Sequence, residues 1–215
     1  MDAGQIATFL FFSALEWLAM FILTFALFKF QLPGYWGRLL LSSLMLSLLS
    51  CLIFVEFNLI LFAPLVQMPI VFLFIWQYFR VPVFYAWLMN VNGYVFYTLL
   101  QAIILFIFEL TGAKIEPNDP SAYIVQSTTI VIVLFLAWRL IRTNWGFTFV
   151  PDTDRVKMMW NNLNRKLLVI SFLGYLGLSM YQFLFFSGIS QEIGLISGLA
   201  VYGILQYLVI KRELQ

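Results

Sequence analysis

The stretch VFYAWLMNVNGYVFYTLLQAIILFIFEL, residues 83–110, is long and apolar enough to cross a lipid bilayer by itself. A helix needs about 20 predominantly apolar residues to cross the hydrocarbon core. If Asn90 and Asn92 formed a loop, only about seven residues would precede it, which is too few to span. We therefore expect one continuous membrane helix that contains both asparagines.

The rest of the chain has the same character. Of its 215 residues 63% are hydrophobic and 10% are charged, and the mean hydropathy is +0.95. Soluble domains carry about 25% charged residues, so these charges cannot cover a water-facing surface. We predict an all-α, polytopic transmembrane helix bundle that forms a single integral membrane domain in contact with the lipid bilayer.

Apolar stretches separated by polar turns predict seven spans. The predicted spans are residues 6–28, 39–55, 59–78, 83–110, 123–140, 167–186 and 193–210. Because 39–55 is short, a bundle of six spans is an alternative. The N-terminal segment MDAGQIATFLFF has an acidic residue where a signal peptide has positive charge, so the first span is expected to be retained.

The distribution of lysine and arginine predicts the orientation. Short cytoplasmic loops are enriched in these residues. With the N-terminus outside and the C-terminus inside, only Lys114 of the 12 basic residues falls on the outer side. We therefore expect an N-out, C-in protein of the bacterial cytoplasmic membrane.

Glu16 is the one acidic residue near the middle of a predicted span. A charged carboxylate at that depth is unfavourable by a few kcal/mol on insertion scales, so such residues are paired, protonated or exposed to water. Two interpretations are open. Glu16 is either a ligand or proton-coupling site, or a protonated group hydrogen-bonded to a neighbouring helix.

A polar and aromatic face runs along the 83–110 helix. Spacings of four, three and four residues place its members on one side; they are Asn90, Tyr94, Tyr97 and Gln101. Asn92 lies about 200° around the helix and serves another surface. The face is either interhelical glue, at about 0.6–2 kcal/mol per hydrogen bond, or one wall of an internal ligand site.

Two further glutamines are candidates for the same roles. Gln67 lies between Pro64 and Pro69, each of which frees a backbone carbonyl one turn earlier. Gln126 begins a polar run near the outer surface, at either the mouth of an outward-facing site or a polar helix entry. Close helix packing is expected at small residues; the candidates are Gly93, Gly174, Gly177, Gly194 and Gly198.

Several classes of function are excluded by composition. The chain has no histidine and one cysteine, Cys51, so neither a histidine-dependent nucleophile nor a multi-cysteine metal site can be built. The last span has no lysine for a retinal Schiff base. Nucleotide-binding motifs are absent. We expect no enzyme activity, no cofactor, no metal and no nucleic-acid partner.

The layout resembles a known family. Seven apolar spans that end in a basic segment, VIKRELQ at 209–215, are similar to the membrane sensor half of bacterial peptide-sensing histidine kinases. The resemblance rests on architecture and implies a helical linker to a kinase region, at the point where this sequence stops. The phosphorylated histidine and nucleotide-binding motifs of that family are missing.

The sequence therefore favours a membrane sensor or receptor-like domain that binds a peptide or small-molecule ligand from the outer side. A small transporter or substrate-binding membrane subunit is the alternative, with Glu16 and the amides as a midplane site. A structural or immunity protein that binds a membrane protein partner, or forms a homodimer, through its glycine-rich hairpin is the third.

Overall fold

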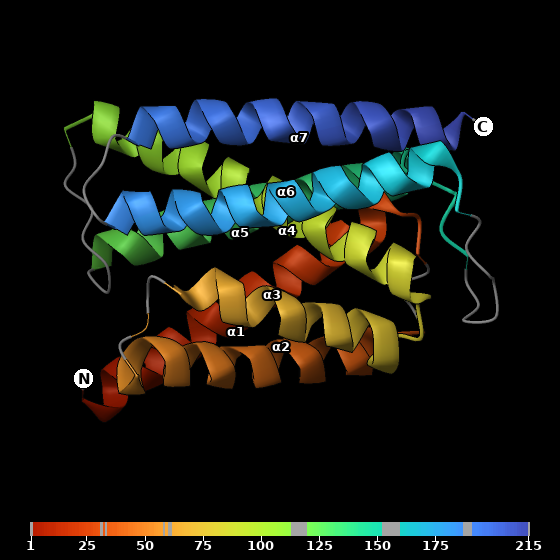
Figure 1. Cartoon of the computed structure of the whole chain (residues 1–215). Coiled ribbons are helices and arrows are strands. Elements are labelled where there is room, and N and C mark those ends of the chain that lie inside the picture. The colour runs from red at the N-terminus through yellow and green to blue at the C-terminus, as the bar shows by residue number, and fades with distance from the viewer. Residues whose placement is uncertain are drawn as a thin grey trace.

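The computed structural model is a bundle of helices (Figure 1). It describes residues 2–30, 32, 34–57, 59, 62–112, 120–151, 160–186 and 191–214, without the side chains of 120, 180–186 and 191–194. The α-helices are α1 (Ala3–Leu27), α2 (Trp36–Cys51), α3 (Ala63–Leu73), α4 (Val83–Leu110), α5 (Pro120–Thr143), α6 (Asn162–Phe186) and α7 (Gln191–Glu213). Two π-helical turns, η1 (Leu52–Glu56) and η3 (Phe74–Tyr78), extend α2 and α3.

Among the described residues, five helices are long and apolar enough to cross a membrane, which identifies an integral membrane protein. They are α1, α2 with η1, α4, α5 and α7. The α3–η3 helix, Ala63–Tyr78, is apolar but shorter, and α6 is not among the five. Of the seven predicted crossings, those of α3 and α6 therefore remain predictions.

The third predicted span begins later than expected, at Ala63 rather than at residue 59. Pro64 occupies the first turn of α3. Proline is tolerated there because the backbone N–H groups of a first turn have no partner within the helix. Pro69 lies inside the helix and removes the donor for the carbonyl of Leu65. The Tyr175 hydroxyl of α6 donates to that carbonyl at 3.1 Å, so another helix satisfies the break.

Helix ends follow from local chemistry. Asp2 and Gln5 form a capping box at the start of α1, each side chain bonding the other's backbone N–H. Lys29, Arg80 and Asn144 follow α1, η3 and α5 with φ of 50°, 60° and 51°. This left-handed conformation ends a helix and usually selects glycine or asparagine.

Two central helices organise the bundle. Helix α1 packs against α2, α4 and α5, whereas α4 also contacts α3, α6 and α7. The contact between α1 and α4 is tight, because a Cβ built on Gly93 would lie 1.8 Å from Thr24 Oγ1. Helices α6 and α7 pack on each other at the side of the bundle away from α2 (Figure 1).

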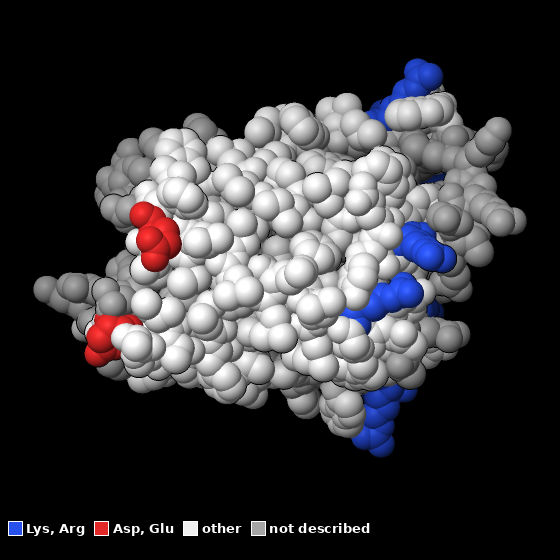
Figure 2. Space-filling model, turned by 90° about the horizontal axis from the view of Figure 1, so that it is seen from below, with Lys and Arg blue, Asp and Glu red and all other residues white. Residues whose placement is uncertain are grey.

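Charged side chains gather at opposite ends of the bundle. Figure 2 shows acidic groups at one end and basic groups at the other, with no charged side chain among the described residues of the face between them. Large hydrophobic side chains such as Leu44, Met45 and Leu48 are exposed along the helices. The basic end holds the ends of α1, η3, α5 and α7 and the start of α2. The basic residues at or next to these helix ends are Lys29, Arg38, Arg80, Arg142 and Arg212. The apolar belt is typical of a lipid-facing surface.

Candidate functional site

Glu16 is the centre of a polar cluster between helices. Its Oε1 accepts a hydrogen bond from the Tyr97 hydroxyl at 3.1 Å and another from Gln101 Nε2 at 2.9 Å. Among the described residues, no hydrogen bond reaches its Oε2. Three of the residues predicted from the sequence are thus brought together, with one carboxylate oxygen held by α4 and the other without a donor.

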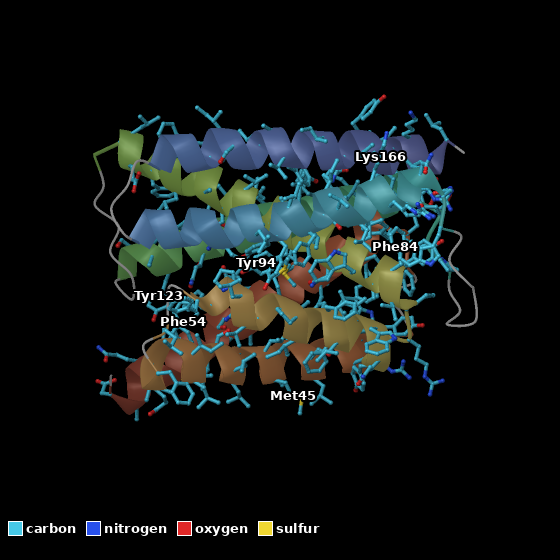
Figure 3. The ribbon with its side chains drawn as sticks, in the orientation of Figure 1. Met45, Phe54, Phe84, Tyr94, Tyr123 and Lys166 are labelled. Atoms are coloured by element: carbon cyan, nitrogen blue, oxygen red, sulfur yellow. The ribbon has the colours of Figure 1, made fainter. Side chains whose placement is uncertain are left out.

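The two other members of the α4 face contact different neighbours. Asn90 is 1% exposed and donates from Nδ2 to the carbonyl of Met68 on α3, at 2.9 Å. Its Oδ1 has no partner in the described part of the chain. The Tyr94 ring lies in the middle of the bundle, 6.4 Å from that of Trp17 on α1 (Figure 3). The face therefore contacts α3 at one end and α1 further along.

Gln67 belongs to a second cluster that the sequence analysis did not anticipate. Ser50 Oγ accepts from Trp17 Nε1 and from Gln67 Nε2, both at 3.0 Å, and donates to the carbonyl of Leu46 at 2.9 Å. One hydroxyl thereby joins α1, α2 and α3 with its full hydrogen-bonding capacity. The signal was available, because Ser43, Ser47 and Ser50 recur at helical spacing on α2.

A third set of contacts joins α4 to α6 and α7. Gln206 of α7 donates to Asn92 Oδ1 at 2.7 Å, and Trp87 Nε1 donates to Ser171 Oγ of α6 at 2.9 Å. The Gln206–Asn92 contact had a signal in the sequence, because Gln206 is an amide within the otherwise apolar stretch of residues 199–210. These bonds hold α6 and α7 against α4.

The predicted packing glycines differ in their surroundings. An added Cβ would lie 1.8 Å from Thr24 at Gly93, 2.9 Å from Leu99 at Gly198 and 3.5 Å from Val201 at Gly174. At Gly177 it would meet nothing within 4 Å among the described residues, so that glycine permits no close approach there. The side chains around Gly194 lie outside the described residues.

Gln126 lies on α5, on the face that also carries the buried Thr129, Ile130 and Val133. Its Oε1 is buried and has no hydrogen-bond partner in the described part of the chain. One turn nearer the acidic end, Tyr123 stacks on Phe12 of α1, with ring centroids 4.8 Å apart (Figure 3). Gln126 therefore belongs to the α1–α5 contact.

Hydrogen bonds from Phe147 and Thr148 to Leu27 and Glu213 join three parts of the chain at the basic end. We call this set of contacts the clasp. The Phe147 N–H donates to the carbonyl of Leu27, at the end of α1, at 2.8 Å. Thr148 donates to the Glu213 carboxylate of α7, at 2.8 Å from its N–H and 2.5 Å from its hydroxyl. The rings of Phe147 and Phe149 also pack on Phe28. The segment after α5 thus connects the ends of α1 and α7.

The polar groups around Glu16 include hydrogen-bond donors and acceptors. Within the described residues, no group of three histidine, cysteine or acidic side chains could hold a metal ion. The Glu16 cluster offers one carboxylate oxygen without a donor among the described residues, one aromatic ring (Tyr97) and one amide (Gln101), groups of the kinds that bind ligands in protein sites. Comparison with protein-family models, with curated proteins and with solved structures gave no match.

Proposed function

We propose that the protein is a sensor or receptor-like membrane domain that binds a ligand from the outer side at the Glu16 cluster. The observation that carries the proposal is the geometry of this carboxylate. One oxygen is fixed by Tyr97 and Gln101, and the second has no donor in the described part of the chain. Intramembrane ionisable residues are functional by default, because their burial is otherwise unfavourable.

The proposed orientation is seven spans with the N-terminus outside, in the bacterial cytoplasmic membrane. The gathering of basic side chains at one end supports it, since lysine and arginine mark the cytoplasmic side (Figure 2). The Phe12–Tyr123 stack and Gln126 then lie between the outer surface and Glu16. A ligand from outside reaches these groups before the middle of the bilayer.

The clasp at the other end supports a signalling role. Helix α1 carries Glu16 in its middle and ends at Leu27, whose carbonyl accepts a hydrogen bond from Phe147. The next residue, Thr148, donates to Glu213 at the end of α7. A ligand shifts a conformational equilibrium only through its different affinity for two states. A bound ligand that moves α1 relative to α4 would change the clasp, and therefore the end of α7.

The first experiment measures binding. Purified protein is melted with peptides and small metabolites, and tryptophan fluorescence is recorded. A ligand at a hundredfold excess over its dissociation constant raises the stability by about 2.7 kcal/mol. We expect at least one compound to stabilise the wild type and to lose this effect in Glu16→Gln. If no compound stabilises the wild type, the binding role is wrong.

The second experiment measures output. A spin label is attached to Leu214→Cys, an exposed position, in a Cys51→Ser background. We expect the ligand to change label mobility, and Thr148→Val to change it without ligand. The matched control is Thr143→Val, because that exposed hydroxyl bonds only the backbone of its own helix. Binding without any change in mobility would contradict a sensor.

Transport is the second candidate, and the depth of Glu16 favours it. Glu16 lies 13 residues after the start of α1 and 11 before its end, so about 20 Å and 16 Å of helix flank it. A midplane carboxylate suits a carried substrate. Uptake of the stabilising ligand into proteoliposomes, abolished in Glu16→Gln, would replace the sensor with a transporter.

A further inference from the structure

The junction of α1, α4 and α5 holds two acceptor oxygens that no donor of the described residues reaches. Glu16 Oε1 already accepts two hydrogen bonds, but Oε2 accepts none among the described residues. Gln126 Oε1 on α5 is buried and likewise has no partner there. Buried polar groups in folded proteins almost always have a partner, so the buried amide oxygen of Gln126 requires an explanation. The second oxygen of a carboxylate inside a membrane span requires one as well.

The two oxygens belong to one level of the bundle. Helices α1 and α5 run parallel, because Phe12 contacts Tyr123 near one end and Leu27 contacts Phe147 near the other. Glu16 is four residues beyond Phe12 and Gln126 three beyond Tyr123, which is about 6 Å and 4.5 Å along the respective helices. Their depths therefore differ by about 1.5 Å.

Both side chains also lie on the facing sides of their helices. Glu16 follows Phe12 by one helical turn, and Phe12 is the residue that stacks on α5. Gln126 shares its side of α5 with Thr129 and Ile130, which are buried. Glu16 and Gln126 are both intermediate in burial, so each residue keeps some exposed surface.

The chemistry of the junction selects the kind of ligand. A carboxylate and an amide carbonyl attract positive charge and hydrogen-bond donors, and they repel an anion. Calcium and magnesium take six or more oxygen ligands, whereas two acceptors are free here. A primary ammonium group has three N–H donors on one charged atom. The rings of Phe12 and Tyr123 are next to this level and suit an attached alkyl chain.

We propose that Glu16 Oε2 and Gln126 Oε1 bind the primary ammonium group of an amine ligand at the α1–α4–α5 junction. This proposal rests on the proposed function and names the class of its ligand. Tyr97 and Gln101 position the carboxylate by holding its other oxygen. The ammonium bridges α1 and α5, so its binding changes the contact between the two helices that the clasp at the basic end also joins.

The test uses three small probes on the full chain in lipid nanodiscs at neutral pH and constant ionic strength. The first, n-butylammonium, has charge and N–H donors. Tetramethylammonium has the charge without donors, and n-butanol has the chain without charge. We expect saturable stabilisation by n-butylammonium alone, measured as a shift in melting temperature. Equal stabilisation by tetramethylammonium would overturn the proposal, and so would a stronger effect of sodium ions.

Variants locate the site. Glu16→Gln should abolish the effect of n-butylammonium, and Gln126→Leu should weaken its affinity about tenfold or more, as expected for a hydrogen bond to a charged group. Gln126→Glu adds a second carboxylate and should tighten binding, which keeps the test decisive if the leucine variant does not fold. Thr128→Val is the matched control, because that exposed hydroxyl bonds only Ile124 of its own helix.

Failure of this proposal is distinguishable from failure of the proposed function. If a neutral or anionic compound stabilises the wild type through Glu16 and n-butylammonium does not, ligand binding stands and the amine site is wrong. If n-butylammonium binds but the label at Leu214→Cys does not respond, the amine site stands and the sensor role is wrong. If Gln126→Leu and Gln126→Glu both bind as the wild type does, α5 contributes nothing and the site is overturned.

Discussion

Replacing Gly93 with alanine tests the closest helix contact in the bundle. The new Cβ would lie 1.8 Å from Thr24 Oγ1 and 2.8 Å from Thr24 Cβ. Rotating the threonine relieves only the first contact, because its Cβ is fixed to the backbone of α1. The threonine hydroxyl is also bonded to the carbonyl of Met20 at 2.8 Å. Helices α1 and α4 must therefore move apart.

The expected magnitude combines two opposing effects. Overpacking a close-packed contact is unfavourable by about 1–3 kcal/mol. Exchanging glycine for alanine inside a helix is favourable by about 1 kcal/mol. Since even the backbone-fixed Cβ atoms would overlap, we expect the upper part of the first range and a net loss of about 2 kcal/mol. For a chain of this size that corresponds to a melting temperature lower by about 4–8 °C.

The assay compares thermal melting of four proteins in the same detergent. Gly177→Ala is the control, because its added Cβ meets no described atom within 4 Å, and it should be neutral or stabilising. Thr24→Ala combined with Gly93→Ala should recover part of the loss, since only the contact between the Cβ atoms remains. If Gly93→Ala is as stable as Gly177→Ala, the tight α1–α4 contact does not exist and the reasoning is refuted.

Three more variants test individual contacts by thermal melting. Ser50→Ala removes the acceptor of an indole and an amide and should lower the stability by about 2 kcal/mol. Ser42→Ala is the control, because the buried hydroxyl of Ser42 has no described partner, and it should be neutral or stabilising. A larger loss of stability in Ser42→Ala than in Ser50→Ala would contradict the hydrogen bonds assigned to Ser50. Tyr175→Phe leaves the carbonyl freed by the α3 proline without its donor, for a loss of about 1 kcal/mol. Tyr207 lies on the exposed surface, so Tyr207→Phe should not change the stability. Equal losses of stability in the two variants would refute the hydrogen bond from Tyr175 to α3. Lys29→Gly should raise the stability by about 1 kcal/mol, because glycine adopts a positive φ without strain. A loss of stability would mean that the contacts of the lysine side chain outweigh the relief of backbone strain.

Much of the helix content could be predicted from the sequence, because a bilayer crossing requires a long apolar run. The α4 helix occupies residues 83–110 as predicted. The start of α3 was wrong by four residues, since an apolar run does not show where Pro64 allows a helix to begin. The length and apolarity of the described helices support five membrane crossings, and α3 and α6 are not among these five.

The candidate site was predictable only in part, for a physical reason. Helical periodicity gives the face on which Tyr97 and Gln101 lie, but it does not give the helix that the face contacts. Their bonds to Glu16 depend on the packing of α1 against α4, which is set by small residues such as Gly93. The role of Ser50 was missed because serine is common in membrane helices and its i, i+4 spacing resembles ordinary packing.

The Glu16 cluster also has a consequence for how the chain is made. The hydrogen-bond partners of Glu16 lie 81 and 85 residues later in the sequence. At a synthesis rate of about 5–20 residues per second, helix α1 exists for roughly 4–16 s before α4 is complete. During that interval the ribosome and the insertion machinery hold a helix with an unpaired carboxylate. The hydrogen bonds that stabilise the buried Glu16 therefore form only after α4 has been made, and α1 enters the membrane without them.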